Sequence, residues 1–227
     1  MPNTLLQTKQ LGQRLWLDNL SRDLLNNGYL QRLITEDGIA GLTSNPAIFY
    51  KAISESPAYQ APLAALKNTT LDAEARYESL VLPDIQAACD LFLPQFDPAG
   101  SLDGYVSLEV SPALAHDTQG TIDAAKRLWA HINRPNLMIK VPATPAGIAA
   151  LKTLIFEGIN VNVTLIFSHA QAQAVFDAYQ AGLLQRATWG YPLHHVRSVA
   201  SVFLSRIDVL VDKKLHAIGT PEALALC

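Results

Sequence analysis

Short apolar runs alternate along the chain with longer stretches of helical periodicity. The longer stretches carry apolar residues three to four positions apart, which is typical of amphipathic helices. A repeated strand–helix–strand order predicts a parallel sheet that is covered by helices and has strands apolar on both faces. The six predicted strands are residues 15–17, 39–43, 105–110, 137–141, 160–165 and 197–202.

Local helix signals agree with this division of the chain. Ser168 precedes the helical pattern HAQAQAVF, and another helix is expected to begin near Thr121 with Asp117 in the loop that caps it. No Gly/Ser-rich linker, low-complexity run or charge block divides the sequence. We therefore expect residues 1–227 to form a single domain.

The composition describes a globular protein with a large interior. Hydrophobic residues make up 49% of the 227 residues and charged residues 16%, against a usual charged fraction of about 25%. The net charge of −3 comes without any basic block, so the chain carries no electrostatic footprint for nucleic acid or an anionic membrane. A small, anionic metabolite fits these numbers as a partner.

The cysteines and the N-terminus indicate the compartment. Cys89 and Cys227 do not form a C-x-x-C spacing, so neither a disulfide framework nor a zinc site is expected, and no other metal site is predicted. No window approaches 18 uninterrupted apolar residues, and the N-terminal segment lacks the apolar core of a signal peptide. The sequence predicts a cytoplasmic protein with no membrane partner.

Polar side chains occur at or near the C-terminal end of every predicted strand. In a parallel β/α barrel these ends converge on one face, where active sites lie. Taken alone, Asn162 and Thr164 would also fit solvent-facing strand positions. The polar residues are Asp18, Thr43, Ser44, Asn45, Glu109, Lys140, Asn162, Thr164 and Ser201.

Two of these residues are harder to explain as surface positions. Taken alone, Asp18 and Asn45 fit a turn or a helix cap better than a catalytic role. Glu109 and Lys140, by contrast, lie inside strongly apolar strands, and charges are buried only when they are paired or functional. The alternatives are a structural Glu109–Lys140 ion pair and a reactive lysine.

A buried lysine among such groups has one well-known chemistry. Its neutral amine attacks a carbonyl carbon, loses water and forms a Schiff base, which is an electron sink for breaking the neighbouring carbon–carbon bond. At the ordinary lysine pKa of about 10.4, only roughly one side chain in a few thousand is neutral at pH 7, and desolvation lowers that pKa. Glu109 and Thr164 are candidates to relay protons through a bound water, and Asp18 to take a proton from a substrate hydroxyl.

Five segments together resemble the motifs of transaldolases. They are GIAGLTSNPAIFYKAI, SLEVSPALAHDT, LMIKVPATPAGIAAL, GINVNVTLIFS and SVASVFLSRID, in the order and spacing of that family, and the likeness is closest to the longer bacterial transaldolases. The resemblance implies an α/β TIM-type (β/α)8 barrel of the class I aldolase kind. It also implies transfer of a three-carbon dihydroxyacetone unit between sugar phosphates, in the non-oxidative pentose phosphate pathway, without a metal or an organic cofactor.

The resemblance further implies roles for individual residues. Lys140 in IKVPAT would form the Schiff base, and Asp18 in LWLDNL would transfer the proton. Glu109 in SLEVS and Thr164 in NVTLIF would hold the catalytic water. The residues implied to bind the dihydroxyacetone unit are Asn45, Asn162 and Ser201.

Two residues near the C-terminus complete the implied site. Arg206 in FLSRID resembles the arginine that grips the substrate phosphate, for which a guanidinium fork has suitable geometry. Phe203 stands where related fructose-6-phosphate aldolases tend to carry a tyrosine, which favours transfer over cleavage. Cleavage of fructose 6-phosphate without transfer is the alternative activity.

The sequence departs from the family in the number of strands. Six are predicted and the family has eight, so the chain is expected to be C-terminally truncated, with the edges of its first and sixth strands unpaired. A chain of this kind is expected to have weak or no activity by itself. Two alternatives follow, namely a partner chain that supplies the missing strands and a homo-oligomer.

Overall fold

The structure is a computed structural model, and it describes residues 3–97, 100 and 102–227. Its centre is one parallel sheet in which the spatial order of the six strands is their order in the sequence. Every strand predicted from the sequence is present, with bounds that differ by one or two residues. The strands are β1 (Trp16–Asp18), β2 (Gly41–Thr43), β3 (Tyr105–Glu109), β4 (Leu137–Pro142), β5 (Val161–Ile166) and β6 (Ser198–Val202).

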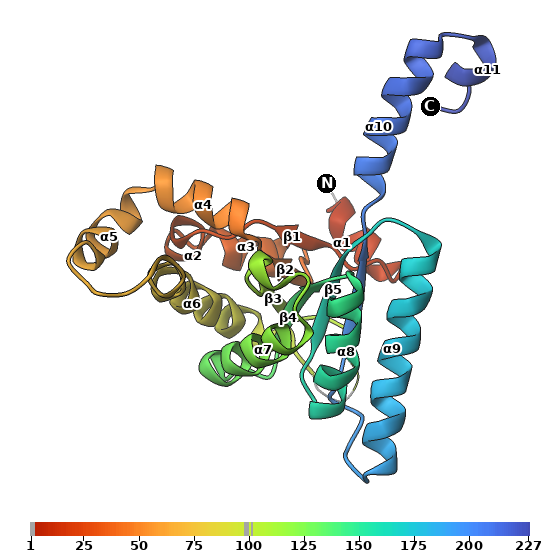
Figure 1. Ribbon diagram of the computed structural model, residues 1–227. Coiled ribbons are helices and arrows are strands. Elements are labelled where there is room, and N and C mark those ends of the chain that lie inside the picture. The colour runs from red at the N-terminus through yellow and green to blue at the C-terminus, as the bar shows by residue number, and fades with distance from the viewer. Residues whose placement is uncertain (1–2, 98–99, 101) are drawn as a thin grey trace.

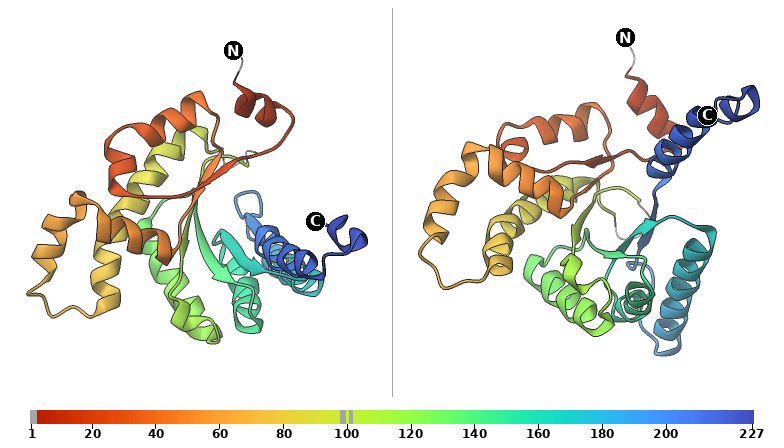
Figure 2. Two further views of the ribbon diagram at one scale, coloured as in Figure 1. Left: turned by 90° about the horizontal axis from the view of Figure 1, so that it is seen from above. Right: turned by 45° about the horizontal axis from the view of Figure 1, so that its top comes forward.

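The sheet is curled, and helices cover its convex side (Figures 1 and 2). This arrangement is an open, partial barrel of the TIM type, which confirms the predicted fold class. Within the described residues no helix is long and apolar enough to cross a membrane. The helices are α1 (Thr4–Gln10), α2 (Arg22–Asn26), α3 (Tyr29–Glu36), α4 (Pro46–Glu55), η1 (Pro57–Tyr59), α5 (Gln60–Leu66), α6 (Ala73–Phe92), η2 (Leu93–Gln95), η3 (Pro112–Leu114), α7 (Thr118–Ile132), α8 (Pro145–Glu157), α9 (His169–Thr188), α10 (Leu204–Ile218) and α11 (Pro221–Leu224).

The two faces of the sheet differ in polarity, which corrects the prediction of strands apolar on both faces. Alternate residues of a strand point to opposite faces, and the register places the branched apolar residues of neighbouring strands on the helix-covered face. The concave face is polar: from β1 to β3 it carries Asp18, Thr43 and Ser107 in one row. In strands this short the alternation rests on only one to three polar residues each, which the apolar neighbours outnumber.

The floor of the concave side is aromatic. Trp16, Gly41 and Tyr105 are register partners on β1, β2 and β3, two residues before the polar row. A side chain at position 41 would have its first carbon 2.5 Å from the Trp16 indole. Any larger residue at position 41 would collide with the indole, so glycine allows Trp16 to pack directly against the backbone of β2.

Side-chain caps set the start of the helices that follow the strands. Ser168 accepts a hydrogen bond from the backbone N–H of Gln171, as predicted. The helix expected near Thr121 begins at Thr118 instead, because the carboxylate of Asp117 accepts from the N–H of Gly120 and so fixes the first turn. The predicted capping segment was correct and the helix start was three residues late.

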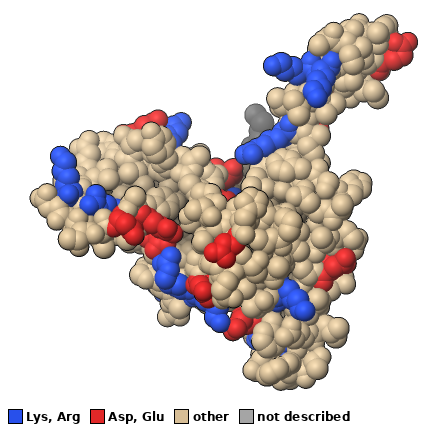
Figure 3. All heavy atoms as spheres, in the orientation of Figure 1, with Lys and Arg blue, Asp and Glu red and all other residues tan. Residues whose placement is uncertain are grey.

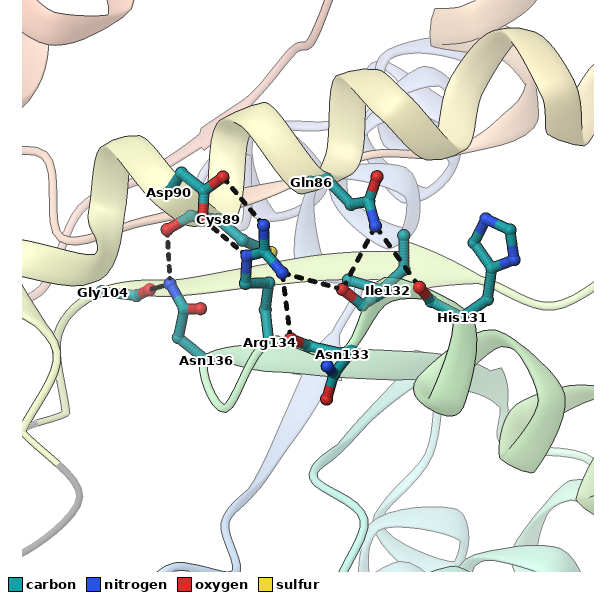
Figure 4. A network of polar contacts seen from close by, with 9 residues as sticks. All are labelled: Gln86, Cys89, Asp90, Gly104, His131, Ile132, Asn133, Arg134 and Asn136. Atoms are coloured by element: carbon teal, nitrogen blue, oxygen red, sulfur yellow. Dashed lines mark hydrogen bonds and ion pairs between the residues drawn. The ribbon is translucent and has the colours of Figure 1, made fainter.

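A polar network at the opposite end of the sheet from these caps fastens α6 to the strands (Figure 4). The buried amide of Asn136 donates to the carbonyls of Cys89 at the end of α6 and Gly104 before β3, at 2.9 and 2.7 Å. Arg134 makes two hydrogen bonds to Asp90, at 2.6 and 3.1 Å. The amino ends of β3 and β4 are therefore held in register by side chains that lie away from the polar concave face.

The sheet is open between its first and last strands. Strands β1 and β6 are the two edges of the described sheet, as predicted. After β6, helix α10 extends away from the rest of the chain (Figures 1 and 2), and it contains no buried residue. The short helix α11, capped by Thr220, folds back against it.

Candidate active site

Lys140 is the central member of a row of polar residues on the concave face. In the sheet register its neighbour on β3 is Glu109 and its neighbour on β5 is Asn162. Because register partners on parallel strands point to the same face, the three side chains lie together near the carboxyl ends of the strands. Lys140 and Asn162 are buried and Glu109 is nearly so.

The Lys140 ammonium is paired but loosely held. Its Nζ lies 3.6 Å from Oε2 of Glu109 and 3.4 Å from the carbonyl oxygen of Ser44, and the side chain is only 8% exposed. Charge-assisted hydrogen bonds are usually about 2.7–2.9 Å long. A nucleophile must leave its hydrogen-bond partners before it attacks. Because both contacts of this amine are long, breaking them costs little free energy.

Glu109 has an altered acidity. Burial raises the pKa of its carboxyl above the usual range, the Lys140 ammonium lowers it by charge and hydrogen bonding, and the charge of Asp18 raises it, with an upward shift as the net result. A carboxyl with a raised pKa holds its proton more strongly than an ordinary glutamate does, which favours a role in proton transfer.

A chain of hydrogen bonds fixes the amide of Asn162. Its Nδ2 donates to the hydroxyl of Ser107 at 3.0 Å, and its Oδ1 accepts from the hydroxyl of Ser201 at 2.9 Å. Ser107 is fully buried, and its carbonyl oxygen accepts from the hydroxyl of Ser44 at 2.8 Å. These side-chain bonds link β5 to β3, which is not its neighbour in the sheet, and reinforce the backbone pairing of β5 with β6.

Ser107 belongs to the site but was not among the predicted residues. The signal for it was present in the sequence, since it stands two residues before Glu109 on the same strand and so shares its face. Ser44 was noted as a polar strand end, and the structure adds that its carbonyl faces Lys140.

Two threonine hydroxyls on the concave side have unused hydrogen-bonding capacity. Oγ1 of Thr164 and Oγ1 of Thr43 are both buried, and neither has a hydrogen-bond partner among the described residues. Buried hydroxyls are usually paired, so such atoms mark places where a polar ligand or water would bind. Thr164 lies two residues beyond Asn162 on the same face of β5.

Asp18 and Asn45 occupy the rim of the concave face. Asp18 ends β1 and is exposed, and its charge acts on Glu109. Asn45 caps α4, since its Oδ1 accepts from the N–H of Ile48 at 3.0 Å. The cap role considered for Asn45 is therefore confirmed, and it engages only one of the two polar atoms of the side-chain amide.

Phe203 and Arg206 lie at the junction of β6 and α10. The Arg206 guanidinium lies over the Phe203 ring, 4.8 Å from its centroid, and the ring packs against Phe167 at 5.5 Å. Arg206 is exposed and α10 extends outward from this point (Figure 1). The structure therefore brings Lys140, Glu109, Asn162 and Ser201 into one connected group, but it gives Arg206 no contact with that group.

Metal-ligand side chains are not clustered in the part of the chain that the structure describes. No three or more His, Cys, Asp or Glu side chains are grouped there as a metal ion would require.

Known proteins of one family match nearly the whole chain. A family model described as transaldolase/fructose-6-phosphate aldolase matches residues 15–225. A transaldolase of Thiobacillus denitrificans is 57% identical over 224 residues, which cover 99% of this chain and 62% of that protein. A transaldolase 2 of Nostoc sp. is 48% identical, covering 95% of this chain and 56% of that protein.

A transaldolase of Mycobacterium ulcerans is 46% identical over 95% of this chain and 58% of its own length. The chain therefore spans about three fifths of the length of these curated relatives.

Proposed function

Because the chain belongs to the transaldolase/fructose-6-phosphate aldolase family, we propose that it serves transaldolase chemistry with Lys140 as the Schiff-base residue. The donor would be a ketose phosphate, sedoheptulose 7-phosphate or fructose 6-phosphate, and the acceptor an aldose phosphate of the non-oxidative pentose phosphate pathway. The observation that carries the proposal is the row of Glu109, Lys140 and Asn162, in which a buried amine has only long contacts to its neighbours.

The reaction begins at the amine. Nζ of Lys140 attacks the ketose carbonyl carbon, and the resulting carbinolamine loses water to give the imine. Glu109 exchanges the protons of this step, and its raised pKa suits it to do so in both directions. The unpaired hydroxyl of Thr164 supports a bound water between these groups.

Bond cleavage follows at the imine. Asp18 takes the proton of the hydroxyl on the fourth carbon, the bond between the third and fourth carbons breaks, and the aldose phosphate leaves. The electron pair passes into the imine, so a three-carbon enamine stays on Lys140. Attack of this enamine on an acceptor aldehyde reverses the sequence, and hydrolysis of the new imine releases the product ketose.

The remaining residues bind the sugar. Asn162 and Ser201 present a fixed pair of polar groups beside the amine, and Asn45 offers the amide nitrogen that its cap bond does not use. Arg206 would bind the phosphate and Phe203 would line the donor site. For Arg206 and Phe203 to fill these two roles, the start of α10 must lie close to the opening of the concave face when substrate is bound.

The open sheet favours low turnover for this chain by itself. The edges at β1 and β6 admit water to the concave face, and α10 has no buried residue to hold Arg206 in place. A partner that covers these edges would exclude water from the imine and raise its yield. Cleavage of fructose 6-phosphate without an acceptor is distinguished by measuring whether product formation depends on added aldose phosphate.

Borohydride trapping tests the proposal. Purified chain is incubated with fructose 6-phosphate, reduced, and measured by intact mass and peptide mapping. We expect a reduced three-carbon adduct on Lys140, no adduct with Lys140→Met, and an unchanged adduct with Lys152→Met, which replaces an exposed lysine of α8. Absence of any adduct on chain that is folded by circular dichroism would refute the proposal for this chain.

A further inference from the structure

A large cavity lies among the helices that follow β2 and β3, and it reaches the carboxyl end of β3. It has a volume of about 1090 Å³, opens to solvent, and is bordered by α4, α5, α6, α7 and the carboxyl end of β3. Cavities that bind small molecules commonly measure about 300–1,000 Å³. The space is therefore large enough for an extended organic ligand.

The walls of this cavity are mainly hydrocarbon. Ile53 comes from α4, Leu63 and Leu66 from α5, and Leu128 from α7, and Leu63 is partly exposed. The adjoining turn is anchored by Tyr59, whose buried hydroxyl donates to Asp84 at 2.7 Å. This bond ties η1, which immediately precedes α5, to α6.

The rim of the cavity has cations without carboxylate partners. Lys67 and Arg76 line it, and among the residues that the structure describes neither has a carboxylate within ion-pair distance. One nitrogen of Arg76 donates to the carbonyl of Thr69 at 2.9 Å, but its Nε is buried without an acceptor. Buried donors are usually paired, so the unpaired Nε of Arg76 marks a place where an acceptor group would bind.

The cavity lining has as many carboxylates as cations, but two of the three carboxylates face other cations. Glu78 is occupied by Arg127 through two hydrogen bonds of 2.6 and 2.7 Å, and Glu109 faces Lys140. Glu74 is exposed at the rim. Figure 3 shows charged side chains of both signs around this helical part of the surface.

We propose that this cavity binds a hydrophobic carboxylate, with the hydrocarbon chain among the apolar walls and the carboxylate at Arg76 and Lys67. A small rotation of the Arg76 side chain brings Nε onto a carboxylate oxygen while a second nitrogen binds the other, which is the two-bond geometry that guanidinium groups favour. Glu109, which faces Lys140, also lines this cavity, so the two sites are neighbours. Binding of a carboxylate at Arg76 and Lys67 nevertheless requires no Schiff base.

Isothermal titration calorimetry with dodecanoate, kept below its micelle concentration, tests this site. We expect a single binding event with a negative heat-capacity change, as burial of apolar surface requires. Dodecyltrimethylammonium has the same chain and the opposite charge, and it should bind at least about tenfold more weakly. The Arg76→Gln variant should lose a similar factor for dodecanoate.

A matched pair of variants on α5 locates the ligand. Leu63→Glu places a carboxylate in the cavity wall and should abolish dodecanoate binding, whereas Ala65→Glu lies on an exposed position outside the cavity and should leave it unchanged. No dodecanoate binding by the folded chain, equal binding of the two detergents, or binding that survives Leu63→Glu would overturn the proposal. So would a dimer in sedimentation that Leu63→Glu dissociates, because a second copy would then cover the cavity.

Discussion

Lys140 and Glu109 are register partners on neighbouring parallel strands, and their charged groups approach to 3.6 Å on the concave face of the sheet. The contact is close enough for each charge to act on the other and too long to be a strong hydrogen bond. A purely structural buried pair needs short, well-aligned contacts to offset desolvation. The long contact therefore favours a functional role for Lys140 and Glu109 over a purely structural ion pair.

Asp18 can be tested separately from the lysine. Replacing it by asparagine removes the base proposed to take the substrate hydroxyl proton, but leaves the amine and Glu109 in place. Trapping of Asp18→Asn with fructose 6-phosphate and borohydride should therefore yield mainly the intact six-carbon adduct instead of the three-carbon adduct, as read by mass. Asp123→Asn, an exposed carboxylate of α7, is the control. A three-carbon adduct at wild-type yield in Asp18→Asn would contradict the assigned role.

The pH dependence of stability should report the acidity of Glu109. Its pKa is raised in the folded chain, so the folded chain keeps the proton to higher pH than the unfolded chain does. The free energy of unfolding contributed by this group is therefore highest in acid, and it falls as the pH rises from the ordinary glutamate pKa of about 4.3 through the raised folded value.

Glu109→Gln removes this proton equilibrium. In urea denaturation at a series of pH values, the variant should gain stability relative to wild type across that window. Glu55→Gln, at an exposed position on α4, should show no such trend. A difference between Glu109→Gln and wild type that stays constant with pH would rule out a raised pKa.

Two substitutions at Asn45 separate its helix-capping role from its proposed sugar contact. Serine is also a good N-cap residue, so Asn45→Ser should keep the wild-type free energy of unfolding, whereas Asn45→Ala should lose about 1 kcal/mol. Both variants lack the amide nitrogen and should trap fructose 6-phosphate more slowly. If Asn45→Ser traps at the wild-type rate, Asn45 is only a cap.

The Asn162 amide should contribute to both stability and trapping. Asn162→Ala leaves the buried hydroxyl of Ser107 without its partner, which should lower the free energy of unfolding by about 1–3 kcal/mol in urea denaturation. Ser201→Ala removes only one, partly exposed bond of the same amide and should cost less. Equal losses in the two variants would mean that the bond to Ser107 adds nothing.

The sequence was sufficient for the strands, and it singled out two charged residues that the structure places side by side. Lys140 and Glu109 stand out because a charge within an apolar run has few structural explanations, and their shared face follows from the register. The alternation of polar and apolar residues along the strands was missed, because Ser107 is a single small polar residue within an otherwise apolar stretch. The cap bond of Asn45 and the outward course of α10 depend on contacts between segments, which residue patterns do not contain.

The order of the strands in the sheet equals their order in the chain, and this has a consequence for biosynthesis. Each strand that leaves the ribosome finds the edge with which it pairs already made, so no strand has to wait for a distant segment. The row of Glu109, Lys140 and Asn162 is complete as soon as β5 has been added. Lys140 therefore has both of its register partners once β5 has paired, and the pairing of β6 then adds the hydrogen bond from Ser201 to Asn162.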